Sequence, residues 1–336
     1  MEAKDIMIKK SLGTWTPNYR LSNVAMTYFE SAQYAHRRIF PVCPVNLPSG
    51  YFYEFSKEDL ARDNLQIKPP FGSVQPAIFG MNEQNYSCKV YQILIGMDEI
   101  LVQPYEREAL DPRKLRVQTI IEQISLHQEI DFAQKFFNAN AWANTWQGST
   151  SYNAAQKKFK KFDASTPDNP IILFDELSTT IRRNGRRRPT KLVLGMDTFT
   201  ALKNNPHILE RVKYSGATAN PALVNENVLA QLFGLESVVV LDATYNDAKI
   251  GQPENMKFVC DSKGALLLYA PDTPRIDTPS AGYTFVWNIA GGNDLVAITE
   301  YDQQDASHVR LLEGLIAFDQ RITAQTLGIF LSDCCS

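Results

Sequence analysis

The segment PSAGYTFVWN, residues 279–288, alternates aromatic with smaller side chains near the end of a 336-residue chain. Side chains on a strand alternate between its two faces, so Tyr283, Phe285 and Trp287 fall on one side. Aromatic stripes stack on bases or sugars in some proteins, but packing within a sheet is their commoner role. The segment therefore predicts a packed strand, and it holds no recognisable catalytic set.

Two predicted long strands follow this segment in the chain, and a predicted α/β block precedes it. The runs at 308–323 and 326–332 are rich in apolar residues and predict two more strands. Upstream, the patterns alternate between helix and strand, which predicts an α/β block over about 168–270. Its expected elements are helices 170–184, 196–206 (stopped by Pro206) and 225–235 (capped by Asn225 and ended by Gly234), with strands at 191–195 and 237–243.

A long helix is predicted over residues 111–138. Asp111 suits its N-cap and Pro112 its first turn. Two apolar lines have helical spacing: Leu126, Ile130, Ala133 and Phe137 form one, and Val117, Ile120 and Ile124 the other. At 1.5 Å per residue the helix would be roughly 40 Å long, which suits a structural spine.

Residues 41–95 read as β structure and residues 1–40 as an arm with a helical patch. One strand run, 50–55, puts Tyr51, Tyr53 and Phe55 on one side, and a second, 85–95, puts Tyr86, Cys88 and Val90 on one side. The connection between them is long, polar and rich in proline. Connections of this length are unusual inside a compact domain, which favours a projecting hairpin over an ordinary surface hairpin.

Composition excludes several classes of protein. The formal net charge of −3 lacks the basic excess of a dedicated nucleic-acid binder. No apolar run is long enough for a signal peptide or a membrane span, so we expect folding in a cytoplasm. The five cysteines are scattered without a CxxC pair. We expect free thiols, including Cys43 and Cys88 near the two strands of the hairpin.

A search for chemistry finds no supported site. The glycine-rich phosphate loops and the G-x-S-x-G elbow are absent. The segment HQEID, 127–131, lacks the second histidine of a zinc-protease helix. We therefore predict no catalytic residues, no cofactor and no metal site.

Two basic clusters leave alternatives open. Lys157, Lys158, Lys160 and Lys161 form one cluster, for which contact with DNA phosphates or a neighbouring subunit is as good an interpretation as a solvated surface. The arginine-rich run 182–188 has the same alternatives, but Asn184–Gly185 favours a solvated turn.

The order of these features resembles the major capsid protein of tailed bacteriophages, which has the Hong Kong 97-type capsid fold. The stretches that carry the resemblance are FPVCPVNLPSGYFYEF, PHILERVKYS, VLAQLFGLESVVVLDATYN, LLLYAP and PSAGYTFVWN, spread over nearly the whole chain. The resemblance implies an α+β fold with four parts. These are an N-terminal arm (1–40), an extended β-hairpin loop (41–95) on a neighbouring subunit, a peripheral domain with the spine helix (96–167 and 273–336), and an axial α/β domain (168–272).

The resemblance also implies a function. Hexamers and pentamers of this chain would build an icosahedral shell around double-stranded DNA, contacted without sequence specificity, in a virion assembled in the host bacterial cytoplasm. Because the arm is short, we expect a separate scaffolding protein, with a portal and in some shells decoration proteins; no membrane, cofactor or enzymatic activity is expected. The alternatives are an encapsulin-like nanocompartment shell and an α/β enzyme with an unrecognised site. Neighbouring genes would separate these alternatives.

The extended loop is expected to clamp the neighbouring subunit. Glu58, Asp59, Arg62 and Phe71 are its candidate contact residues. Arg62 is the expected anchor, because a guanidinium binds a carboxylate through two hydrogen bonds. Replacing Arg62 by alanine should then weaken the shell and leave the subunit folded.

Overall fold

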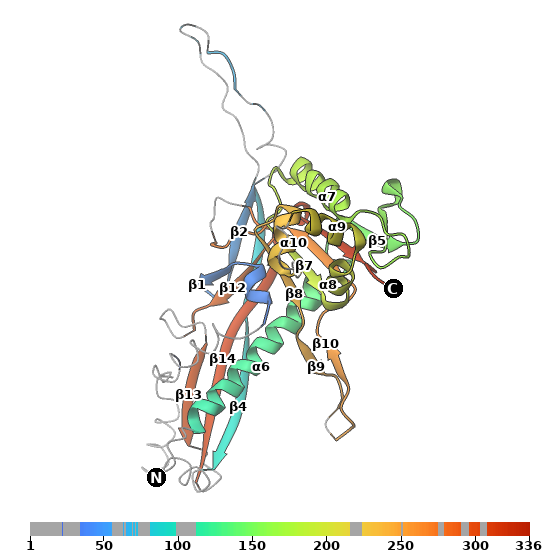
Figure 1. The fold of residues 1–336 in the computed structure, drawn as a ribbon. Helices are drawn as coiled ribbons and strands as arrows, with labels where there is room; N and C mark the ends of the chain where they lie inside the picture. The colour runs from blue at the N-terminus through green and yellow to red at the C-terminus, as the bar shows by residue number, and fades with distance from the viewer. Residues whose placement is uncertain are drawn as a thin grey trace.

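The computed structural model describes residues 22, 34–55, 63, 65–68, 70, 72, 81–98, 112–215, 224–249, 251–274, 279–289, 296–302 and 308–336. Within them it shows two large sheets, a long helix against one of them, and a cluster of shorter helices around the other (Figure 1). The fold is α+β, as the sequence predicts.

The first sheet has five strands and is built around the longest strand, β14 (Val309–Ile322). All pairings of β14 are antiparallel, while β1 pairs in parallel with β12. The other strands are β1 (Val42–Val45), β12 (Gly282–Trp287), β13 (Ala297–Asp302) and β4 (Lys89–Asp98). The aromatic segment of the sequence thus forms β12, where Phe285 stacks on Tyr86 with ring centroids 4.7 Å apart. The aromatic stripe therefore contributes to packing.

Helix α6 (Pro112–Lys135) packs along one face of this sheet (Figure 1). Its buried face is the line of Val117, Ile120 and Ile124, continued by Phe132. The other predicted line is only half-buried at Leu126, Ile130 and Ala133. The helix is about 36 Å long by its rise per residue, close to the expected spine.

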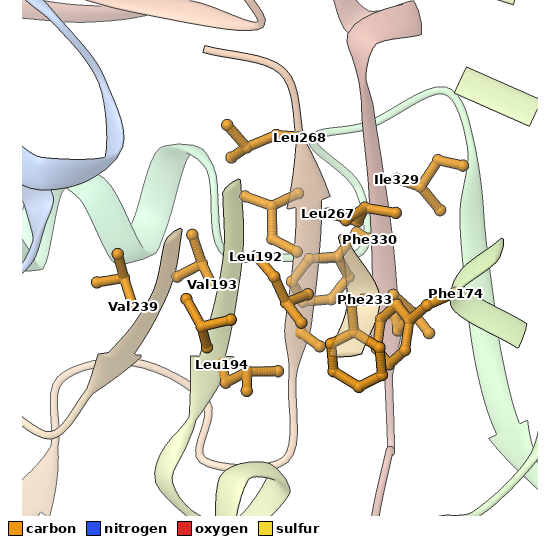
Figure 2. Close-up of a cluster of buried hydrophobic side chains, with 14 of the residues drawn as sticks. Phe174, Leu192, Val193, Leu194, Phe233, Val239, Leu267, Leu268, Ile329 and Phe330 are labelled. Atoms are coloured by element: carbon orange, nitrogen blue, oxygen red, sulfur yellow. The ribbon is translucent and has the colours of Figure 1, made fainter. Parts of the chain in front are cut away.

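The second sheet has six strands, in the order β6-β5-β15-β11-β7-β8. Figure 2 shows its central side chains, including Leu192, Val193 and Leu267, within one apolar cluster. The strands are β5 (Thr145–Ser149), β6 (Lys158–Lys160), β7 (Lys191–Gly195), β8 (Ser237–Leu241), β11 (Ala265–Leu268) and β15 (Gly328–Ser332).

Four helices pack around the second sheet: α7 (Pro170–Gly185), α8 (Met196–Lys203), α9 (Pro206–Ser215) and α10 (Glu226–Phe233). The predicted caps of α10 are confirmed, since the Asn225 side chain accepts from Val228 N and Gly234 has φ of 63°. Pro206 has a second role that the pattern did not indicate. It begins α9, because proline suits the first turn of a helix.

Sheet membership crosses the domain boundaries expected from the sequence. Strands β5, β6 and β15 lie in stretches assigned to the peripheral domain, yet they pair within the sheet of the α/β block. Strand β15 pairs with β11 through Leu266 and Phe330, which are 64 positions apart and share no local pattern. The expected division therefore separates strands that the structure joins.

The predicted hairpin is present as β2 (Ser49–Phe55) and β3 (Met81–Ser87). Figure 1 shows residues 65–68, in the connection between them, far from both sheets. The expected single strand over 85–95 is wrong in one respect, because it breaks at Cys88 between β3 and β4. Tyr86 and Cys88 are buried, but Val90 is 53% exposed, since the inward-facing side switches after the break.

Smaller elements complete the described chain. Helix α3 (His36–Ile39) lies against α6, and β9 (Thr244–Asn246) pairs with β10 (Met256–Phe258) in a projecting hairpin (Figure 1). Two short 3-10 helices are η1 (Ala154–Gln156) and η2 (Gln325–Leu327).

Gly148 in β5 is expected to tolerate no side chain. A Cβ there would lie 1.9 Å from the backbone oxygen of Asp333, which directly follows β15. The paired strands β5 and β15 would therefore have to separate. Gly148→Ala should lower the free energy of unfolding by about 3 kcal/mol, measured by denaturant titration. Gly96→Ala in β4 is the control, since its Cβ would meet only side-chain atoms 3.9 Å away. Equal effects of the two changes would contradict the strand packing described here.

Candidate interaction surfaces

The tip of the extended loop exposes two large apolar side chains. Leu65 is 93% exposed and Ile67 is 96% exposed, the highest values among the exposed large hydrophobic residues of the described chain. Asp63 precedes them, and its Oδ1 accepts a hydrogen bond from Leu65 N at 3.1 Å. Side chains of this kind, presented away from the body, are typical of a surface that binds a partner.

The predicted clamp residues of the loop lie outside the described residues. They are Glu58, Asp59, Arg62 and Phe71. The clamp prediction for Arg62 therefore stays a prediction. The charges of the loop do not indicate Leu65 and Ile67, although two apolar residues two positions apart in a polar connection are a usable signal in the sequence.

The base of the loop is held by a buried carboxylate, Asp319 of β14. Its Oδ2 accepts from Ser87 N at 3.0 Å and from Arg321 Nε at 2.8 Å, and its Oδ1 lies 3.5 Å from Lys135 Nζ. These groups line a cavity of about 800 Å³ between the hairpin, α6 and β14. Asp319 thus joins the loop, the spine helix and the first sheet at the break after Ser87. In the sequence, the signal for this contact is a single aspartate, Asp319, near the end of a largely apolar strand.

The arm is attached to the body by a second buried ionic contact. The backbone N and the Nδ1 of His36 lie 2.9 and 2.8 Å from Oε2 of Glu129 on α6. Nε2 of His36 lies 3.2 Å from Oε1 of Gln128. Both ring nitrogens of His36 thus lie within hydrogen-bond distance of oxygen atoms on α6. Nearby, Lys191 Nζ donates to the carbonyl of Arg38 at 2.8 Å, so the second sheet also holds this segment.

The four candidate lysines do not form one uniform patch. Lys157 is exposed and has a left-handed backbone, with φ of 53°. Lys158 and Lys160 are half-buried in β6, and Lys160 Nζ donates to Thr166 Oγ1 at 2.8 Å. Lys161 Nζ donates to the carbonyl of Cys335 at 3.2 Å. Two of the four ammonium groups are thus engaged within the subunit.

The arginine run forms the C-terminal end of α7. The helix continues through Gly185, and the turn falls at Arg186, whose φ is 57° and whose N donates to Arg182 O. The arginines of the run are exposed in the single subunit, and Asn184–Gly185 lies within the helix and not in the turn.

The five cysteines are free in the structure, and burial raises the pKa of each. For Cys88, desolvation comes first and the nearby charge of Asp319 second, raising the pKa to about 11. Within the described residues, no group of three or more histidine, cysteine, aspartate or glutamate side chains is placed to hold a metal ion. None of the described helices combines the length and hydropathy that crossing a membrane requires.

Raised thiol pKa values predict sensitivity to alkali. In the folded protein these thiols stay protonated at pH values above the pKa of an unfolded thiol. The free energy of unfolding therefore keeps its full value below about pH 8.5 and falls as the pH rises through the pKa values of the folded thiols. The midpoint of urea unfolding should therefore drop between pH 8.5 and pH 11. Cys88→Ala should reduce this drop, and an identical pH dependence in that variant would contradict the role of Cys88.

The chain is similar to known phage capsid proteins. No family model matches it. The major capsid protein of Burkholderia phage BcepMu is 26% identical over 239 residues, which cover 68% of this chain and 70% of that protein.

Solved structures share the fold at lower identity. A phage-related protein from Bordetella bronchiseptica RB50 matches with a TM-score of 0.70 and 19% identity, over 95% of this chain and 97% of that one. A virus-like particle from Pyrococcus furiosus matches with a TM-score of 0.53 and 9% identity, over 94% and 98%. The capsid of Cyanophage P-SCSP1u matches with a TM-score of 0.51 and 9% identity, over 87% and 86%. In sequence the chain is therefore similar to a phage major capsid protein, and it has the Hong Kong 97-type capsid fold.

Proposed function

We propose that this chain forms the hexamers and pentamers of an icosahedral shell that encloses a double-stranded DNA genome. The observation that carries the proposal is the extended loop, whose Leu65 and Ile67 are almost fully exposed far from the body. Burying them requires another molecule, and a neighbouring copy supplies one at every position of a shell.

The role is structural, and the assembly partners follow from it. The chain needs no catalytic group to build a shell. A separate scaffolding protein would act during assembly, and a portal and decoration proteins would be bound by the shell. Exposed Lys157 is the candidate among the four lysines for non-specific contact with DNA phosphates. In this proposal the arm (1–40) and the loop (41–95) have separate roles in the shell, and strands β5, β6 and β15 belong with the axial part whose sheet they share.

Assembly of the purified chain tests the proposal. Concentrated subunits, alone and with the scaffolding protein encoded beside them, should form closed particles with five-fold and six-fold rings in negative-stain microscopy. A chain that stays monomeric under all these conditions would overturn the proposal. The nanocompartment alternative predicts similar shells, so the content of particles from infected or expressing cells separates the two: DNA supports a capsid, and a packaged enzyme supports a nanocompartment.

A further inference from the structure

Helix α7 carries opposite charges at its two ends. Asp168, Asp175 and Glu176 are exposed at or near its N-terminal half. The exposed arginines of its C-terminal end are Arg182, Arg183, Arg186, Arg187 and Arg188. Figure 1 shows α7 at the outer edge of the helices that surround the second sheet, so both ends are accessible.

Four of these arginines have no carboxylate partner among the described residues. In the described part of the chain, Arg182, Arg183, Arg187 and Arg188 form no ion pair with a carboxylate. Asp175 and Arg182 are about 10 Å apart along the helix axis, and no ion pair joins them in the structure. A second copy can bring an acidic end into direct contact with an arginine end.

Two exposed side chains with apolar surface lie beside the carboxylates at the acidic end of α7. Ile172 is 66% exposed and Tyr152 is 45% exposed. The hydroxyl of Tyr152 donates to Oε2 of Glu176 at 2.7 Å, which fixes the ring beside α7. Exposed apolar side chains with a polar rim are the composition of a protein–protein interface.

The macrodipole of α7 accounts for Arg182 and Arg183 in its last turn but not for the rest of the pattern. A helix dipole favours carboxylates in the first turn and cations in the last turn. Arg187 and Arg188 lie beyond the end of the helix, and the dipole gives no reason for an exposed Ile172.

We propose that the α7 edge is a head-to-tail contact between copies of this chain. The acidic end of one copy, centred on Ile172 and Tyr152, binds the arginine end of the next. A contact between two different surfaces of the same molecule closes into a ring when its rotation allows. This inference rests on the proposed function, because it assigns a contact within the rings of the shell. DNA is the weaker occupant of the arginine end, because it would leave Ile172 exposed and would be repelled by the carboxylates of the same helix.

Charge reversal tests the contact. An acidic variant carries Arg182→Glu, Arg183→Glu and Arg187→Glu, and a basic variant carries Asp168→Lys and Asp175→Lys. Each should assemble at least tenfold less than the wild type, because like charges then face each other. A chain with all five changes should regain assembly. Glu176 is kept so that its hydrogen bond to Tyr152 remains.

Mixing the two variants gives a sharper result. Acidic and basic copies complement each other only when they alternate around a ring. The mixture should therefore form rings of six and no rings of five, so closed shells should be absent. Lys203→Glu with Lys213→Glu, on α8 and α9, is the control and should assemble normally. Circular dichroism should show that every variant is folded.

The outcomes separate this inference from the proposed function. If the wild type forms shells and both reversed variants form them equally well, the α7 contact is wrong and the shell function stands. If the acidic variant forms normal shells that hold less DNA, the arginines face the genome and the contact between copies is again wrong. If the wild type forms no shell under any condition, the proposed function itself fails.

Discussion

Replacing His36 by alanine should lower the free energy of unfolding by about 3–5 kcal/mol. The change removes the imidazole whose Nδ1 lies 2.8 Å from Oε2 of Glu129, and the Glu129 side chain is fully buried on α6. The second carboxylate oxygen, Oε1, already has no hydrogen-bond partner within the described chain. A buried polar group that loses its partner is costly, and removing one member of a buried pair costs more than the pair itself contributes.

Denaturant unfolding measures this effect, and two further variants control it. His36→Ala combined with Glu129→Gln changes both partners of the contact and should recover part of the lost stability. His207→Ala changes a half-buried histidine whose Nε2 lies 3.1 Å from the Pro167 carbonyl, and it should cost about 1 kcal/mol. If His36→Ala and His207→Ala have the same small effect, the buried pair does not hold the arm to the spine helix.

Replacing both Leu65 and Ile67 by serine should prevent efficient shell assembly. Burying one such side chain stabilises a contact by about 1.5–3 kcal/mol, so each subunit would lose about 3–6 kcal/mol of contact energy. The stability of the isolated subunit should not change, because both side chains are almost fully exposed in it.

Light scattering of assembling subunits measures the loss, and thermal unfolding of the free subunit checks the fold. Leu47→Ser is a matched control, because Leu47 is 63% exposed but lies at the base of the hairpin. Assembly of the double variant at the wild-type concentration threshold would show that the loop tip contributes no contact.

The sequence predicts elements whose limits are set by neighbouring residues. Helix α10 is an example, since Asn225 and Gly234 cap it through groups a few positions away. The buried side of α6 is different, because its sequence offers two apolar lines. The first sheet selects the line of Ile120, which packs against Gly314 far along the chain. Local spacing does not contain that information.

The contact sites depend still more on distant residues. Ser87 and Asp319 are 232 positions apart, and their hydrogen bond marks the point where the hairpin leaves the sheet. His36 and Glu129 are 93 positions apart, and each is unremarkable in its own segment. The opposite charges of α7 were visible in the sequence, but their exposure and lack of internal partners came only from the fold.

A cryo-electron microscopy reconstruction of assembled particles would test whether this chain is a shell subunit. We expect a closed icosahedral shell in which each subunit occupies a five- or six-membered ring, with Leu65 and Ile67 buried against a neighbouring copy. A particle without such rings, or a monomer whose Leu65 and Ile67 fold onto its own body, would contradict this function.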